Sequence, residues 1–142
     1  MIQIKGKIAG VDFNSAPAYI DILVGTNDSF IGHRVHCTKE NTSYNAGDSV
    51  RLHTTLILKE ESKTIYGFRS KEEKSFFELL LKSSGIGGNT ALFIMDNINS
   101  VDELADAILN EDLDYFTKIK GIGEKTAIKM IRDLKKKVKG IM

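Results

Sequence analysis

Cysteine, proline and long apolar runs are nearly absent from this sequence of 142 residues. The single cysteine, Cys37, excludes an internal disulfide and any metal site built from cysteine alone. No apolar segment approaches the ~18–20 residues that span a bilayer, and the polar start of the chain lacks the apolar core of a signal peptide. We therefore expect a cytoplasmic protein with no membrane partner.

Net charge is also small, at +1, so the total charge does not argue for a nucleic-acid partner. The charges are unevenly distributed, however. Seven acids and no Lys or Arg lie between Asp96 and Asp114, whereas nine basic residues and two acids lie from Lys118 onward. A basic terminal segment fits a nucleic-acid surface, and it fits a solvated helix face equally well.

Strand patterns occupy residues 1–66. Turn signals separate the runs, and Gly6 and Gly10 are candidate bulges in the first of them. In the third run, alternation through Ile31, His33, Val35 and Cys37 predicts one shared face. Five short strands in a segment of this length predict an OB-type barrel. The expected strands are Ile2–Val11, Tyr19–Val24, Phe30–Thr38, Val50–Leu58 and Thr64–Phe68.

Helical patterns replace the strand patterns near Ser70, where the apolar period changes from two to about 3.6. Ser70 with Glu73, and Ser100 with Glu103, fit capping boxes at helix starts. We expect a fold of class β + α, with a barrel over 1–66 and an all-α domain over 67–142. The expected helices begin near residue 71 and cover 90–95, 101–109, 113–119 and 126–138.

An internal repeat lies within the helical half. Leu81–Ala91 and Thr117–Ala127 both read as helix, then Gly-Ile-Gly, then helix, with Thr-Ala three residues past the second glycine. The two copies are 36 residues apart. Glycines permit a tight turn with positive φ, and Ile86 or Ile122 between them can fix that turn in the core. The repeat therefore predicts two similar helix–turn–helix units.

Such a turn can bind an anion. The helix that follows begins with amide groups that have no intrahelical acceptor, and its dipole favours negative charge there. In the second copy Lys125 adds charge, with Lys118, Lys120 and Lys129 expected around it. Phosphate is the expected anion, and contacts of this kind hold a nucleic-acid backbone without reading bases. The simpler alternative is a pair of tight helix–helix turns capped by glycine.

Gly-Ile-Gly between helices resembles the helix-hairpin-helix motif. Two such motifs behind a small barrel resemble the RuvA family, which comprises the Holliday-junction-binding subunits of the bacterial branch-migration machinery. The resemblance covers nearly the whole chain. It includes Met1-Ile2 with Gly6, Lys59-Glu60-Glu61, Ile65-Tyr66-Gly67-Phe68 and both hairpins.

Membership of this family implies a fourfold ring of chains that binds an open four-way DNA junction, with a stacked octamer as the alternative assembly. It also implies an acidic pin at the junction centre, and Glu60 and Glu61 occupy the matching positions. From the residues alone, these two would be a solvated β-turn. The residues expected to contact DNA are Gly85, Ile86, Gly87, Asn89 and Thr90 in the first hairpin, and Lys118, Lys120, Gly121, Ile122, Gly123, Lys125 and Thr126 in the second.

The sequence departs from the family pattern in three places. Gly88-Asn89 stands where the family often has Pro-Lys, so Lys82 is the only cation expected near the first hairpin. The barrel half carries seven basic and seven acidic residues through Tyr66. The family also continues into a third domain that binds the RuvB motor ATPase. We expect this domain to be absent after Met142, which leaves a RuvB partner open.

Enzymatic alternatives lack their residues. No Gly-x4-Gly-Lys-Ser/Thr loop occurs, so the chain is not expected to hydrolyse ATP. His33, His36 and Cys37 do not form a complete zinc site, and a glycosylase would need a catalytic carboxylate and a base pocket that the Lys-rich end does not supply. We expect a non-catalytic protein without cofactor or metal. Two alternatives remain: a general duplex-binding module without junction preference, and a protein-interaction domain.

Overall fold

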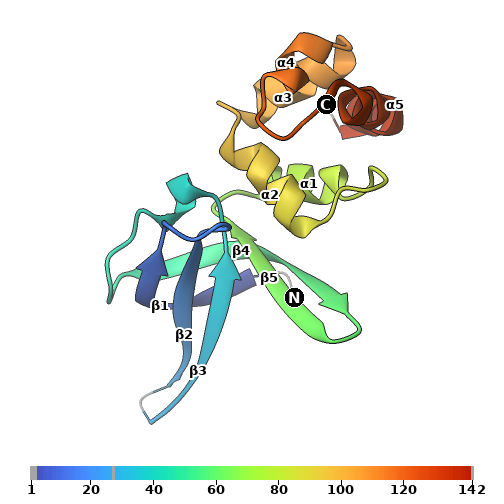
Figure 1. The fold of residues 1–142 in the computed structure, drawn as a ribbon. Helices are drawn as coiled ribbons and strands as arrows, with labels where there is room; N and C mark the ends of the chain where they lie inside the picture. The colour runs from blue at the N-terminus through green and yellow to red at the C-terminus, as the bar shows by residue number, and fades with distance from the viewer. Residues whose placement is uncertain (1–2, 27, 142) are drawn as a thin grey trace. The chain divides into compact units, whose positions relative to one another are not determined.

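The fold comes from a computed structural model that describes residues 3–26 and 28–141. The chain divides into two compact units, Met1–Lys74 and Ser75–Met142. The first is a β-barrel and the second is helical (Figure 1). The class predicted from the two periodicities is therefore confirmed.

Five strands form a closed barrel in the order β1-β2-β3-β5-β4. The β3–β5 pair is parallel and the other pairs are antiparallel, with β4 pairing back to β1 to close the barrel. This is the five-stranded OB-type arrangement expected from the sequence. The strands are β1 (Gln3–Asp12), β2 (Tyr19–Thr26), β3 (Ser29–His36), β4 (Ser49–Lys59) and β5 (Ser62–Phe68), with a short 3-10 helix η1 (Lys39–Thr42) between β3 and β4.

Inward-facing apolar side chains fill the barrel. Two glycines act as spacers there, because a Cβ on Gly67 would lie 2.5 Å from Val35 and one on Gly6 would lie 2.4 Å from the carbonyl oxygen of Leu23. The expected bulge at Gly10 is confirmed by a register shift between Ile8 and Gly10, whereas Gly6 pairs regularly and is a point of close approach. The core comprises Ile4, Ile8, Ile20, Ile22, Val35, Cys37, Val50 and Leu52.

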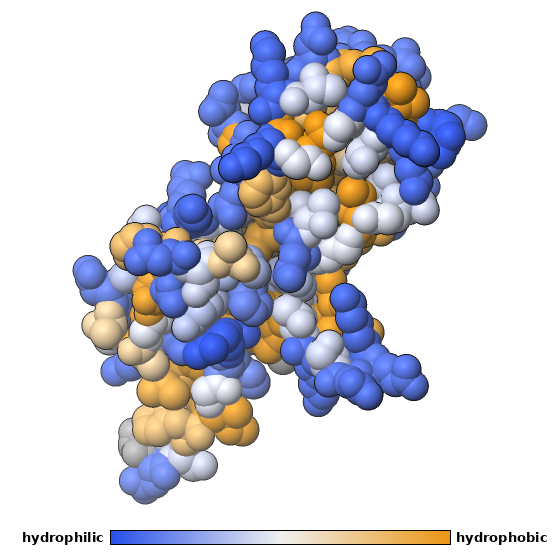
Figure 2. Space-filling model, viewed as in Figure 1, coloured by the Kyte–Doolittle hydropathy of each residue, from blue (hydrophilic) through white to orange (hydrophobic). Residues whose placement is uncertain are grey.

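The β2–β3 hairpin extends past the rest of the barrel (Figure 1). The strands next to its polar turn carry exposed apolar side chains: the exposed fractions of Leu23, Phe30 and Ile31 are 38%, 57% and 65%. Hydrophobic residues gather on this part of the hairpin in Figure 2, just before its hydrophilic end. Ile31 fits the expected alternation along β3 but is exposed, because the start of this strand lies beyond the barrel core, which the strand enters at Val35.

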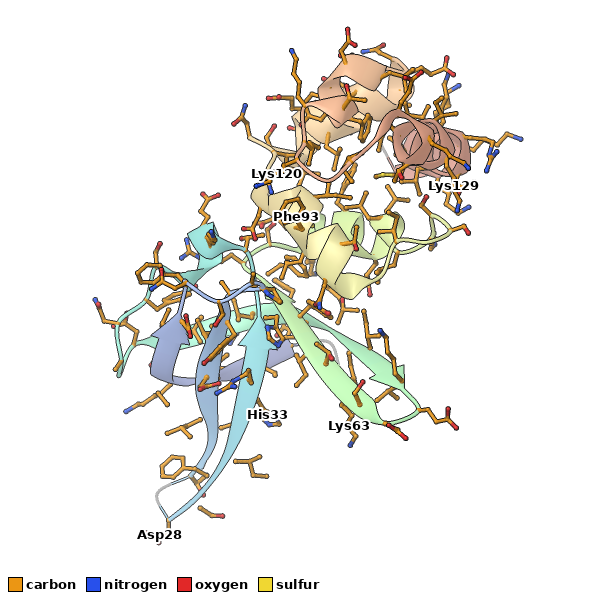
Figure 3. The ribbon with its side chains drawn as sticks, in the orientation of Figure 1. Asp28, His33, Lys63, Phe93, Lys120 and Lys129 are labelled. Atoms are coloured by element: carbon orange, nitrogen blue, oxygen red, sulfur yellow. The ribbon has the colours of Figure 1, made fainter. Side chains whose placement is uncertain are left out.

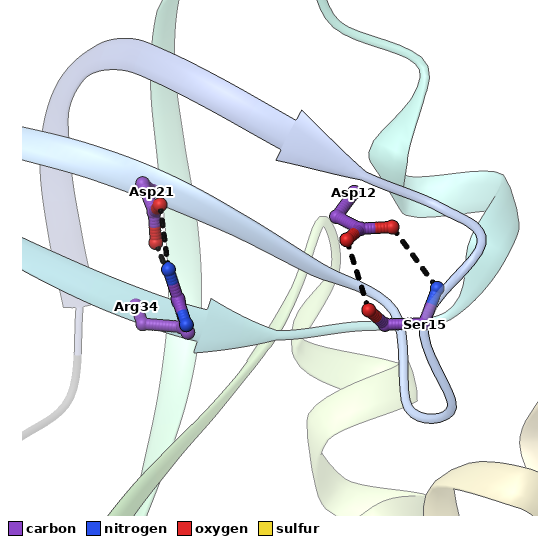
Figure 4. Close-up of polar contacts among 4 residues, drawn as sticks. All are labelled: Asp12, Ser15, Asp21 and Arg34. Atoms are coloured by element: carbon purple, nitrogen blue, oxygen red, sulfur yellow. Dashed lines mark hydrogen bonds and ion pairs between the residues drawn. The ribbon is translucent and has the colours of Figure 1, made fainter.

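One polar contact lies within this hairpin and another in the turn that precedes it (Figure 4). The Arg34 guanidinium donates to both carboxylate oxygens of Asp21 across the β2–β3 pair, at 3.0 and 3.2 Å. It also lies 4.0 Å from the ring centre of Tyr19. In the turn after β1, Asp12 accepts from the backbone N–H and hydroxyl of Ser15, and these hydrogen bonds lower the pKa of the Asp12 carboxyl.

Five α-helices follow in the described part of the chain, and two of them begin at serines that the sequence predicts as caps. Ser70 Oγ accepts from the amide of Glu73, and Ser100 Oγ from that of Glu103, each at 3.1 Å, so both predicted caps are confirmed. Helix α5 packs against α3 and α4. The helices are α1 (Lys71–Leu80), α2 (Gly88–Asp96), α3 (Val101–Leu109), α4 (Leu113–Thr117) and α5 (Glu124–Ile141).

Candidate nucleic-acid interface

The two Gly-Ile-Gly turns have nearly the same backbone. Their first glycines are left-handed, with φ +84° at Gly85 and +89° at Gly121. The isoleucine amide then closes the turn: Ile86 N–H donates to the Ser83 carbonyl at 3.1 Å, and Ile122 N–H to the Ile119 carbonyl at 3.0 Å. The repeat in sequence is therefore a repeat in structure.

The isoleucines hold these turns against the helical core. Ile86 and Ile122 are only 7% and 6% exposed. Ala91 and Ala127, the alanines at the same position of the two copies, are fully buried on the next helix. Burial of these side chains leaves the opposite side of each turn, its backbone, facing outward.

The second glycines mark the starts of α2 and α5. The Gly87 carbonyl accepts the first helical bond from Ala91 at 2.9 Å, and the Gly123 carbonyl accepts from Ala127 at 3.0 Å. Both glycines are exposed, and a Cβ added to either would meet no atom within 4 Å. Open space thus lies beside the first amides of each helix, where the dipole favours an anion.

Polar and basic side chains surround these helix starts. Asn89 and Thr90 are exposed at the first, and Lys120 and Lys125 at the second, where Thr126 is half-buried. The chain thus brings together nearly all the residues expected to contact DNA. The helix that follows the second turn carries an exposed lysine, Lys125, where the helix that follows the first carries Asn89.

One basic residue was assigned to the wrong turn. Its place in the sequence put Lys129 with the second hairpin, but a Cβ on Gly85 of the first hairpin would lie 3.5 Å from the Lys129 Nζ. Lys129 extends from α5 beside the loop between α1 and α2 (Figure 3). Lys82 is therefore not the only cation near the first hairpin. The sequence could not show this, because the assignment depends on how α5 packs.

Helix α5 also holds the first hairpin through Asp133. The Asp133 carboxylate accepts from Ser83 Oγ at 3.2 Å and from the Ser84 amide at 3.3 Å. Desolvation tends to raise the pKa of Asp133, but these two hydrogen bonds and the Arg132 guanidinium outweigh it and lower the pKa. This anchor was missed from the sequence, where Asp133 read only as an acid in a basic helix.

Lys118 has different surroundings from the other predicted contacts. It lines a hollow of about 290 Å³ together with Glu103, Asp112, Asp114 and Tyr115. Burial of the Tyr115 ring and the nearby Glu103 charge raise the pKa of the phenol to about 12. The acids in this hollow oppose an anion, so Lys118 serves in part to balance them.

Glu60 and Glu61 form the turn between β4 and β5. Lys59 pairs with Ser62 to close this hairpin, and both glutamates are exposed. Lys63 follows on β5 (Figure 3). The turn therefore presents two adjacent carboxylates to solvent, which is the position the family resemblance implies for an acidic pin.

Other types of site find no support in the part of the chain that the structure describes. Within residues 3–26 and 28–141, no group of three His, Cys, Asp or Glu side chains is placed to hold a metal ion. None of the described helices is both long and apolar enough to cross a membrane.

Comparison with known proteins defines the class first. Residues 77–136 match the model of the SAM-like helix-hairpin-helix tandem, so the helical unit is a double helix-hairpin-helix domain. Residues 1–67 match the model of the RuvA N terminal domain.

Individual relatives then define the family. The chain is 38% identical over 136 residues to the Holliday junction branch migration complex subunit RuvA of Paraburkholderia xenovorans, covering 94% of this chain and 67% of that protein. Its identity to the RuvA of Fervidobacterium nodosum is 44% over 80% of this chain and 60% of the relative. Its identity to the RuvA of Staphylococcus aureus strain Newman is 47%, over 63% of this chain and 44% of that relative. The chain belongs to the RuvA family.

Proposed function

We propose that this protein binds four-way DNA junctions independently of sequence and holds them open for branch migration or resolution during recombination and repair. The observation that carries the proposal is the pair of matching hairpins, each with an exposed helix start beside open space. The relatives are named as subunits of the Holliday junction branch migration complex, and this name points to the same substrate.

The hairpins explain how binding can ignore sequence. Backbone amides and lysine ammonium groups donate to phosphate oxygens, which are the same at every base pair. Each contact also releases condensed counterions, so affinity falls as salt rises. We expect the protein to contact the arms through phosphates alone, at the residues of both hairpins.

Assembly into a homotetramer forms part of the proposal, with an octamer of two stacked rings as the larger alternative. Exposed apolar side chains on the β2–β3 hairpin support it, because covering side chains such as Phe30 and Ile31 with a neighbouring chain is favourable. A ring of four would use repeated head-to-tail contacts. Phe30→Asp should shift the assembly toward monomer in sedimentation velocity. Lys63→Asp, a substitution at an exposed residue of β5, is the control and should leave the assembly unchanged.

The acidic turn provides a means to discriminate junctions from duplex. Carboxylates of Glu60 and Glu61 at the junction centre would repel phosphates and separate strands at the crossover. The double variant Glu60→Lys with Glu61→Lys should lower the ratio of junction affinity to duplex affinity. The factor by which this ratio falls should exceed the factor by which the duplex affinity changes. An unchanged ratio would remove this role.

The protein is proposed to act as a non-catalytic, cytoplasmic subunit, with a RuvB-type ATPase supplying the energy for branch migration. The relatives' name as part of a complex supports a partner of this kind. The observation that would overturn it is ATP hydrolysis by the purified chain alone in the presence of junction DNA.

An electrophoretic titration tests the central proposal. One four-way junction and one linear duplex of equal length are each titrated with protein at two salt concentrations. Junction preference that persists at higher salt is the expected result. Equal affinity for both DNAs would instead support a general duplex-binding module, and binding to neither would support a protein-interaction domain.

A further inference from the structure

The two hairpins differ in the residues of the helices that follow them. Helix α5 carries Lys125 and Lys129, one turn apart, whereas the equivalent positions of α2, 36 residues earlier, are Asn89 and Phe93. Judged along the sequence, the second hairpin has two lysines and the first has neither. A phosphate site without a cation would be the weaker of the two.

Packing within the helical unit redistributes these side chains. The Nζ of Lys129 lies 3.5 Å from the position of a Cβ on Gly85, in the first hairpin. Reciprocally, a ring carbon of Phe93 lies 3.9 Å from the position of a Cβ on Gly121, in the second hairpin. Because residues 93 and 129 are equivalent in the repeat, each motif places this side chain at the glycine turn of the other.

The contact between α5 and the first hairpin is held in place. Asp133 lies four residues after Lys129, hence on the same face of α5. Its carboxylate accepts from Ser83 Oγ and the Ser84 amide, immediately before Gly85. One face of α5 thus anchors the loop with a carboxylate and places an ammonium group beside its left-handed glycine.

Lys129 is able to act on a bound anion. None of the ion pairs within the described residues involves it, and its side chain is half-buried against the loop. Its ammonium group therefore keeps its charge and its three donors for a ligand. Partial burial also restricts the side chain before binding, which lowers the conformational entropy that it loses when it binds.

We propose that Lys129, although part of the second motif, is the phosphate-binding cation of the first hairpin, so that Lys125 and Lys129 serve one hairpin each. The inference rests on the proposed function, since it assumes that the hairpins bind phosphate. It assigns a DNA contact that neither the repeat nor the position of Lys129 in the sequence identifies.

Lys129→Gln tests the inference, with Lys139→Gln as the matched control. Lys139 is exposed on the same helix, ten residues and therefore ~15 Å further along. Lys129→Gln should weaken junction binding at least fivefold to tenfold and lower the slope of log K against log salt by about 0.9 for each protomer bound, as expected for one lost phosphate contact per protomer. Lys139→Gln should change neither. Equal behaviour of the two variants in binding would overturn the inference and leave the proposed function standing.

A double-mutant cycle shows which hairpin Lys129 serves. In a Gly87→Asp background, where the first anion site is blocked, Lys129→Gln should have no further effect on binding. In a Gly123→Asp background its full effect should persist. The reverse pattern would assign Lys129 to the second hairpin and overturn the inference.

Charge rescue provides an independent readout. Asn89→Lys places a lysine at the position equivalent to Lys125, and it should restore the affinity and salt slope of Lys129→Gln. Failure to restore either counts against a shared phosphate site. The wild-type chain is measured first. If it binds no DNA, both the proposed function and the inference are refuted.

Discussion

The two hairpins share a backbone but obtain their charge in different ways. Gly85 and Gly121 have almost the same φ, and both following helices start beside open space. The second hairpin carries its lysine, Lys125, on its own helix, while the first has Lys129 beside it from the other motif. Under the assignment proposed for Lys129, a tandem can provide a lysine to both hairpins although only one of the two following helices carries lysines.

Blocking either anion site should have the largest effect. Asp at Gly87 or Gly123 places a negative charge where phosphate would bind, and each should cost roughly 2 kcal/mol or more, about thirtyfold in junction affinity. Both positions accept a Cβ without contact, and Asp suits a helix start, so stability should not fall.

Asn at the same positions is the control, because it has the same size without the charge. Fluorescence anisotropy with a labelled junction measures all four variants. If the two hairpins are equivalent, the Asp variants lose similar amounts. A loss confined to Gly123→Asp would show that the first hairpin does not bind DNA.

Left-handed glycines should matter for folding in both copies alike. Gly85→Ala and Gly121→Ala force an L-residue into positive φ, which costs about 1–2 kcal/mol in the free energy of unfolding. Asn tolerates this region better, so Gly85→Asn and Gly121→Asn should cost less. Urea denaturation followed by circular dichroism compares them. Equal stability of the Ala variants and wild type would mean that the turns relax, and the two hairpins would not be rigid.

Removal of the Asp133 anchor should affect the first hairpin alone. The pKa of Asp133 is lowered in the folded chain, so its contribution to stability is present above the unfolded value of about 3.9 and is lost as pH falls through the lower folded value. Asp133→Asn should lower stability at neutral pH and remove this part of the acid dependence. Hydrogen exchange should quicken at the Ser84 amide but not in the second hairpin. The same pH profile in both proteins would contradict the anchor.

Tyr115, which precedes the second hairpin, should give the smallest effect. Its buried hydroxyl has no hydrogen-bond partner among the described residues, so Tyr115→Phe should leave the unfolding free energy unchanged or raise it by less than ~1 kcal/mol at pH 7. The raised pKa, about 12, means that wild-type stability falls as pH rises from about 10 toward 12. Tyr115→Phe should lose less unfolding free energy than wild type over that pH interval, as measured by urea titrations. An identical decline in the two proteins would place the hydroxyl in solvent.

Sequence reasoning recovered the parts of this molecule that depend on local pattern. Alternation located the five strands, and the two serine caps at Ser70 and Ser100 located helix starts to the residue. The glycine spacing gave both hairpins because a left-handed turn followed at once by a helix restricts the residue type. These features are encoded within a few consecutive residues.

Features that depend on packing between distant segments were not accessible. Ile31 fits the alternation of β3, yet it is exposed because the hairpin tip leaves the barrel. Gly6 read as a bulge, yet its role is close approach to β2. Lys129 and Asp133 lie beside a loop 44 to 50 residues earlier in the chain, and only the packing of α5 brings them there.

Interference by neutral phosphates tests the central claim most directly. Methylphosphonates replace single phosphates along one arm of a four-way junction, and the affinity for each substituted junction is measured alongside junctions with altered bases. Affinity should fall at two separate short runs of phosphates on the arm, one for each hairpin, and base changes should have no effect. Sensitivity to the bases, or no loss at any phosphate, would contradict a protein that holds junction arms by paired backbone-binding hairpins.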